Sequence, residues 1–209
     1  MDFLKRLEGV FFNPRPTFEA LAAKPKWVDA LAVILVALIA FTFLVTPYMQ
    51  NDQLTLMKDN TVLKERMGAE RYDQMIQRME NPTPASRVVQ TFLTTPLFYL
   101  AALLLQALIL LILGRFFSTQ GNYVLVLSAL LHANLIDKLF GNAVRRVLAL
   151  TRKSVMQTST NLTILFPKME VTSTPFILLA QVDFFQLWLF GVLAFGLAAA
   201  FKIELKKAL

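Results

Sequence analysis

The chain has 209 residues, of which 56% are hydrophobic, and a formal net charge of +7. It has no cysteine, which excludes disulfides, thiolate metal sites and cysteine nucleophiles. Its single histidine, His132, leaves no cluster for a zinc or di-iron centre, so we expect no cofactor and no metal. The positive charge indicates contact with anionic lipid headgroups, and nucleic-acid binding is the weaker interpretation because no such motif accompanies it.

The apolar residues are concentrated in long blocks that are apolar all round, as lipid requires. Soluble domains are only about 45–50% apolar. The sequence therefore predicts an all-α integral membrane protein, a bundle of four transmembrane helices with additional interfacial amphipathic helices.

Residues 1–26 are expected to form a cytoplasmic amphipathic lead-in, followed by a transmembrane domain at residues 27–209. Five apolar residues recur at helical spacing near the start, as in a short helix on a membrane surface: Phe3, Leu4, Leu7, Val10 and Phe11. Charged residues throughout the lead-in leave no apolar region for a cleavable signal peptide, so we expect the first apolar block to stay in the membrane.

The first span is predicted at residues 28–48, between the interfacial aromatics Trp27 and Tyr48. Residues 50–87 form a polar helical loop. A modest apolar stripe would place this loop against the membrane or another protein, and a solvated helical hairpin is the equal alternative. The second span is predicted at residues 88–117, long enough to tilt or to extend past the bilayer.

The third segment begins at Tyr123, and its pattern changes at Asn134. From there one helical face carries Lys138 and Arg145, so the helix is expected to leave the bilayer as a basic amphipathic stretch that lies on headgroups. A polar loop at residues 151–174 precedes the final span, predicted at residues 183–202, with an interfacial piece at residues 176–181.

Three polar positions allow a functional interpretation. His132 and Ser128 lie four residues apart and suggest a proton relay or pore lining, but a helix–helix hydrogen bond is favoured. Asp137 and Lys138 are neighbours expected to point apart without forming an ion pair, and an interfacial role is favoured for Asp137. Asp183 would bind a cation or cap the last helix; capping is favoured, with about 1 kcal/mol lost on its removal.

Two further positions in the last span are expected to be structural. Gly191, Gly196 and the alanines at 198–200 give this helix a smooth face for close packing. Trp188, five residues after Asp183, should pack against another span.

Two motifs resemble those of bacterial Yip1-domain proteins. The first is the stretch at residues 12–27, in which a proline-containing turn and Thr17-Phe18 precede a short helix, Pro25 and Trp27. The second, at residues 181–208, resembles an Asp-x-Phe-x-x-Trp signature through Asp183, Phe185 and Trp188, with Gly196-Leu197 and a terminal Lys-Ala following. The resemblance implies an all-helical membrane domain, typically of five spans where this sequence supplies four. It also implies a cytoplasmic N-terminus. Eukaryotic relatives act in vesicle traffic and contact Rab GTPases, whereas bacterial members have no settled activity.

No nucleotide-binding, hydrolase or metalloprotease motif is present, so we expect no enzyme. The leading hypothesis is a Yip1-type protein that scaffolds membrane partners. These partners include further copies of the chain, as in an oligomer. The alternative is a small transporter or channel with a polar path near His132 and Asp183. The basic residues before the first span predict a cytoplasmic N-terminus. The resemblance implies that the membrane is a bacterial inner membrane. If the third segment did not cross fully, three spans would leave the termini on opposite sides.

Overall fold

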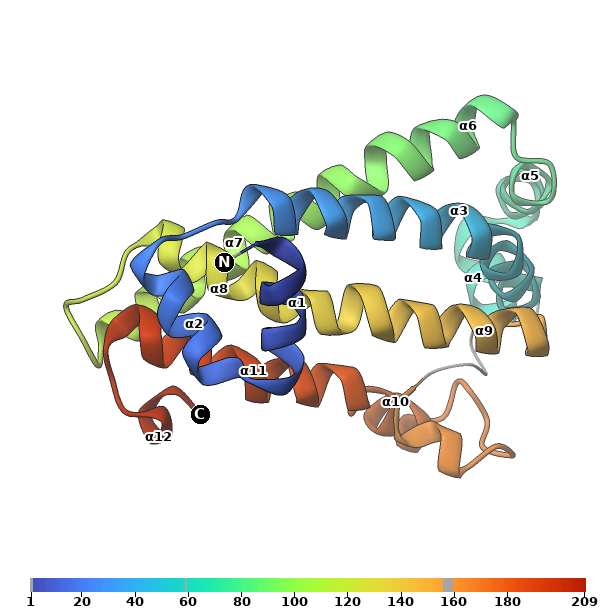
Figure 1. Ribbon diagram of the computed structural model, residues 1–209. Coiled ribbons are helices and arrows are strands. Elements are labelled where there is room, and N and C mark those ends of the chain that lie inside the picture. Colours follow the sequence, from blue (N-terminus) through green and yellow to red (C-terminus); the bar gives the residue numbers. More distant parts are fainter. Residues whose placement is uncertain (1, 59, 156–159) are drawn as a thin grey trace.

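The computed structural model describes residues 2–58, 60–155 and 160–209. Four helical stretches in this part of the chain are long and apolar enough to cross a membrane, and this confirms the predicted four-span, all-helical bundle. They are α3 (Val28–Lys58), the continuous stretch Pro84–Arg115, the continuous stretch Tyr123–Arg152, and α11 (Phe184–Phe201). The helices lie roughly side by side, and both termini lie at the same end of the bundle (Figure 1).

The helix boundaries follow from local chemistry. Helix α3, the first span, continues ten residues beyond its predicted end at Tyr48. It contains Pro47, which does not end the helix. The second stretch begins at Pro84, where the Thr83 side chain caps α6 (Pro84–Val89) and proline occupies the first turn, which needs no amide donor. It continues through a π-helical segment, η1 (Gln90–Thr94), into α7 (Thr95–Arg115).

The third stretch lies at the centre of the bundle. It consists of α8 (Tyr123–Leu135), the π-helical segment η2 (Ile136–Gly141) and α9 (Asn142–Arg152). From Val126 to Asp137 every residue of it is buried. The polar face of this stretch turns inward on both sides of Asp137, with Asn134 and Arg145 largely covered, while Val144, Val147 and Leu150 are exposed. Lys138 and Arg145 therefore face the protein instead of lipid headgroups. Arg146, Arg152 and Lys153 are exposed, and their contact with headgroups stays a prediction.

The lead-in forms two helices, α1 (Phe3–Phe12) and α2 (Pro14–Ala23), that pack on the bundle. Val10 of α1 and Phe18 and Leu21 of α2 are buried in the same core as the central helix. In Figure 1 both helices lie across the faces of the spans, and α2 contacts α11 and α8. Burial of these side chains anchors the lead-in to the protein itself.

The polar loop is a helical hairpin, α4 (Thr61–Met67) and α5 (Ala69–Glu80), braced against the end of α3. The buried Tyr72 hydroxyl donates a hydrogen bond to the Met57 carbonyl at 2.5 Å. Lys58 and Glu80 form an ion pair at 2.5 Å. The hairpin is joined at Gly68, whose φ of +82° favours glycine because it has no Cβ.

The segment before the last span contains two short helices, η3 (Leu162–Leu165) and α10 (Thr174–Ala180), the second close to the piece expected at residues 176–181. The described chain ends in α12 (Leu205–Ala208). Lys202 follows α11 with a left-handed conformation, φ +53°, that ends the helix. As a result the last span has 18 helical residues, a length of about 27 Å at 1.5 Å per residue.

Candidate functional site

The π-helical segment η2 sets up a cluster of charges in the third span. A π turn adds one residue to the helical repeat, which shifts the register of neighbouring side chains and is frequent at functional sites. Here Lys138 Nζ lies 2.6 Å from Oδ2 of the preceding residue, Asp137. The prediction that these neighbours would not form an ion pair was wrong, because it assumed a regular α-helix.

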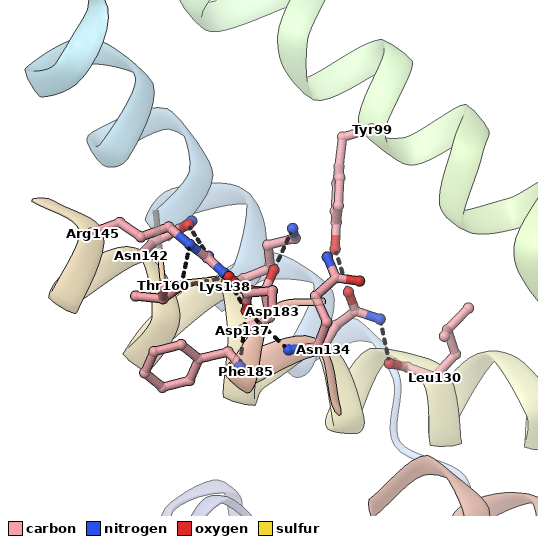
Figure 2. Close-up of polar contacts among 11 residues, drawn as sticks. Tyr99, Leu130, Asn134, Asp137, Lys138, Asn142, Arg145, Thr160, Asp183 and Phe185 are labelled. Atoms are coloured by element: carbon pink, nitrogen blue, oxygen red, sulfur yellow. Dashed lines mark hydrogen bonds and ion pairs between the residues drawn. The ribbon is translucent and has the colours of Figure 1, made fainter. Parts of the chain in front are cut away.

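The cluster extends from Asp137 to the start of the last span. Arg145 Nη2 lies 2.8 Å from Asp137 Oδ1 and 3.0 Å from Asp183 Oδ1, so one guanidinium joins two carboxylates. Thr160 donates its hydroxyl to Asp183 Oδ2 at 2.5 Å and accepts a hydrogen bond from Arg145 Nε at 3.1 Å. Figure 2 shows these side chains converging between the third and fourth spans. Two acids and two bases are thereby neutralised where isolated charges would be costly.

Asp183 has two roles in this arrangement. Its Oδ1 accepts hydrogen bonds from the backbone amides of Phe185 at 2.8 Å and Gln186 at 3.2 Å, which caps α11 as the sequence indicates. It also binds Arg145 and Thr160, which the sequence did not predict. Partial burial by itself would raise the pKa of Asp183, but the hydrogen bonds from Thr160 and Arg145 and the Arg145 charge outweigh it and lower that pKa.

Backbone contacts fix the approach to Asp183. Phe184 N donates to the Thr160 carbonyl at 3.2 Å, and Leu162 N donates to the Val182 carbonyl at 3.0 Å. These bonds hold the loop after the third span beside the start of the fourth. Gly141 is needed in the same place: a Cβ there would lie 2.9 Å from Arg145 Nη1 and 3.0 Å from Asp137 Oδ1.

A branch of the polar network reaches the second span. The Tyr99 hydroxyl of α7 donates to Asn134 Oδ1 at 3.2 Å, and Asn134 Nδ2 donates to the Leu130 carbonyl at 2.8 Å. The Lys138 ammonium lies 5.5 Å from the centre of the Tyr99 ring, within range of a cation–π interaction. The network therefore connects three of the four spans (Figure 2).

His132 belongs to a separate cluster nearer the lead-in. Arg6 of α1, only 2% exposed, forms an ion pair with Asp29 of α3, and its Nε lies 3.4 Å from His132 Nε2. His132 Nδ1 lies 2.8 Å from the carbonyl of Ser128, whose hydroxyl donates to the Lys26 carbonyl at 3.5 Å. No contact between described residues joins His132 to Asp183, the two positions of the expected polar path.

Two basic residues central to these clusters, Arg6 and Arg145, were not singled out from the sequence. Arg6 had a usable signal, because it shares a helical face with Phe3 and Val10, three residues before it and four after it. A charge on an apolar face indicates a buried partner. For Arg145, helical spacing places the side chain on the same face as Lys138, but it does not show that this face meets Asp183.

The remaining candidates are packing positions. Trp188 stacks edge-on against Phe11, with ring centres 5.5 Å apart and an interplanar angle of 88°. This contact joins the last span to the lead-in helix α1, and the expected packing of Trp188 against another span stays a prediction. A Cβ at Gly196 would lie 2.8 Å from Ala129 Cβ and 3.0 Å from Phe18 Cδ1, so this glycine permits α11 to approach α8 and α2. Gly191 has open space around it.

The chemistry available here is electrostatic. Among the described residues no three His, Cys, Asp or Glu side chains are placed to hold a metal ion. The charged groups of the cluster bind one another and connect segments that are far apart in the chain. Such contacts fix helix positions, and Lys138 and Arg145, with side chains 22% and 20% exposed, are both partly accessible.

Comparison with known proteins adds one finding. No curated protein and no solved structure matches the chain. The family model for the Yip1 domain matches residues 9–209, which includes the last turn of α1, all of α2 and all four spans. The chain therefore belongs to the Yip1 family of integral membrane proteins.

Proposed function

We propose that this protein is a non-enzymatic scaffold that organises partner proteins in the membrane. The observation that supports the proposal is the mutual pairing of charges inside the bundle. Asp137 and Asp183 are neutralised by Lys138 and Arg145, and Arg6 and Asp29 neutralise each other. Transport paths usually contain ionisable groups that are accessible to a passing substrate, whereas these groups hold helices together.

The α4–α5 hairpin offers a surface for partners. It lies at the end of the bundle away from both termini (Figure 1). Its charged side chains are exposed, including those of Glu70, Arg71 and Asp73. Exposed charges of both signs on a short braced hairpin suit a polar protein partner better than a lipid surface.

Localisation and orientation complete the proposal. The five basic residues before the first span favour a cytoplasmic N-terminus, and the bacterial inner membrane is the proposed location. With four spans the C-terminal lysines then return to the cytoplasmic side, and the α4–α5 hairpin lies on the other side. Anionic headgroups on the cytoplasmic side are the expected lipid partners of the lead-in.

Site-specific photo-cross-linking in cells tests the scaffold. A cross-linker at Arg71, exposed on α5, should capture discrete protein partners. The matched control is a cross-linker at Phe98, which is 71% exposed on the apolar face of α7 and should give lipid adducts. Equal protein capture at the two positions, or none at Arg71, would contradict the proposal.

A small transporter or channel is the second candidate, and one observation favours it. His132 and Asp137 are both buried on the central helix, five residues or about 7.5 Å apart along its axis. Two polar clusters at that spacing resemble steps of a proton path. Proton flux into vesicles containing the purified full chain, abolished by Asp137→Asn, would support this candidate over the scaffold.

A further inference from the structure

A groove lies between the second, third and fourth spans. It has a volume of about 340 Å³, within the range of small-molecule sites in proteins. Its walls come from α7, the α8–η2 segment and α11, and are largely apolar, with Leu103, Leu130, Leu189 and Leu193 among them. A groove of this kind on the outside of a membrane bundle is accessible to lipid.

One end of the groove is polar. Tyr99, Asn134, Asp137 and Lys138 line it there. Asp137 is already held by Lys138 and Arg145, but the Lys138 ammonium has three N–H donors, and one hydrogen bond, to Asp137, is observed. The polar end of the groove therefore presents a partly accessible cation, Lys138, next to the apolar walls.

Two glutamines on the groove walls strengthen the case for a polar ligand. Gln106 lies in the apolar second span and Gln186 near the start of the fourth, and both side chains are exposed. Neither forms a side-chain hydrogen bond within the described ranges of the chain. Carboxamides that face hydrocarbon are unfavourable without a partner.

The depth of the polar end matches that of a phosphate group. The apolar helix α11 is about 27 Å long, close to the ~30 Å hydrocarbon thickness, so its N-cap Asp183 marks one boundary of the hydrocarbon layer. Arg145 joins Asp183 to Asp137, and Asp137 joins Lys138. Lys138 is thus held near headgroup depth, with the apolar groove leading toward the bilayer interior.

We propose that this groove binds an anionic phospholipid of the bilayer, with its phosphate at Lys138 and an acyl chain along the wall formed by α7 and α11. The headgroup carries the charge opposite to Lys138, and the apolar walls match the chain. The inference goes beyond the proposed function and does not depend on it, because a lipid site is compatible with either a scaffold or a transporter.

The test uses the purified full chain in phosphatidylcholine nanodiscs that contain a small fraction of phosphatidylglycerol with a photoreactive acyl chain. After irradiation, labelled peptides should concentrate on α7 and α11 around Leu103 and Leu193. Phosphatidylcholine with the same photoreactive chain should label the groove about tenfold less, because its choline cation offsets the phosphate charge that faces Lys138. Equal labelling by both lipids, or labelling spread evenly over the exposed face of α3, would overturn the proposal.

Two variants make the test specific. Lys138→Gln should lower phosphatidylglycerol labelling in the groove about tenfold, while Lys138→Arg should retain it. Because Lys138→Gln also removes a partner of Asp137, Ile109→Trp provides a second approach: it fills the groove from an exposed wall position and should block labelling with the charge cluster intact.

The matched control is Ile112→Trp, one turn further along α7, exposed and outside the groove, which should leave labelling unchanged. Undiminished labelling in Ile109→Trp, or an equal loss in Ile112→Trp, contradicts the site. Cross-linking from Arg71 is measured separately: its loss with normal lipid labelling counts against the scaffold alone, and the reverse result counts against the lipid site alone.

Discussion

Replacement of Asp183 tests the joint between the third and fourth spans. If Asp183 acted only as an N-cap, its removal would lower the free energy of unfolding by about 1 kcal/mol. The structure adds a charged hydrogen bond from Arg145 at 3.0 Å and one from Thr160 at 2.5 Å. Such bonds contribute about 1.5–3 kcal/mol each when a charged group is involved. Arg145 stays paired with Asp137 in the variant, which limits the penalty for the remaining charge.

Because Arg145 keeps its pairing with Asp137, Asp183→Ala loses in net terms the cap and about one charged hydrogen bond, and we expect a loss of about 2.5–4 kcal/mol in the free energy of unfolding. Asp183→Asn keeps a good capping group and loses the charge, so it should lose about half as much. Both values come from reversible unfolding in mixed detergent micelles, followed by circular dichroism. Because the charge acts through Arg145, the cost of Asp183→Asn should nearly vanish in an Arg145→Gln background.

Two results would refute this reasoning. A loss below about 0.5 kcal/mol for Asp183→Ala would mean that neither the cap nor the ion pair contributes. An undiminished cost of Asp183→Asn in the Arg145→Gln background would mean that the pair is not coupled, whatever its distance in the structure.

Three other predictions follow from the same structure. The lowered pKa of Asp183 means that its stabilisation is present above the ordinary carboxyl value near 3.9 and is lost as pH falls through the lower folded value. The stability difference between the wild type and Asp183→Asn should thus be constant from about pH 5 to 8 and shrink below about pH 4; a difference that grows on acidification contradicts it. Gly196→Val should cost about 1–3 kcal/mol through overpacking against Ala129 and Phe18, whereas Gly191→Ala, with open space, should be nearly neutral; thermal unfolding in detergent compares them, and equal effects would exclude close packing as the cause. For orientation, cysteine at Lys168 in the exposed loop between the third and fourth spans should react with an impermeant thiol reagent on intact cells, and cysteine at Lys5 should not; the opposite pattern would reverse the proposed topology. From the sequence, Ser159 in the same loop would serve equally well for cysteine labelling, but it lies outside the described residues.

The spans were predictable because their signal is local. A run of about twenty apolar residues has one stable arrangement in lipid, so composition alone locates the start of α3 and both ends of α11 within a few residues. Asp183 was predictable as a cap for the same reason: an acid directly before an apolar helix meets free backbone amides whatever the rest of the fold does.

The charge clusters were not predictable, because they depend on register and on distant partners. The π turn at η2 moves Lys138 toward Asp137, and no residue between 136 and 141 is a specific marker of a π turn. Arg145 binds an acid 38 positions away, and Arg6 lies beside a histidine 126 positions away. Helical periodicity shows which residues share a face, but it does not show which faces meet.

The distance in sequence between Arg6 and His132 also has a consequence for biogenesis. At about 5–20 residues per second, the ribosome needs roughly 6–25 s after Arg6 to synthesise its histidine neighbour. Asp29 appears much earlier, so the Arg6–Asp29 pair is available first. Full docking of α1 must wait for insertion of the third span. Nascent chains arrested shortly before His132 should therefore leave α1 sensitive to protease, and chains released after α11 should protect it.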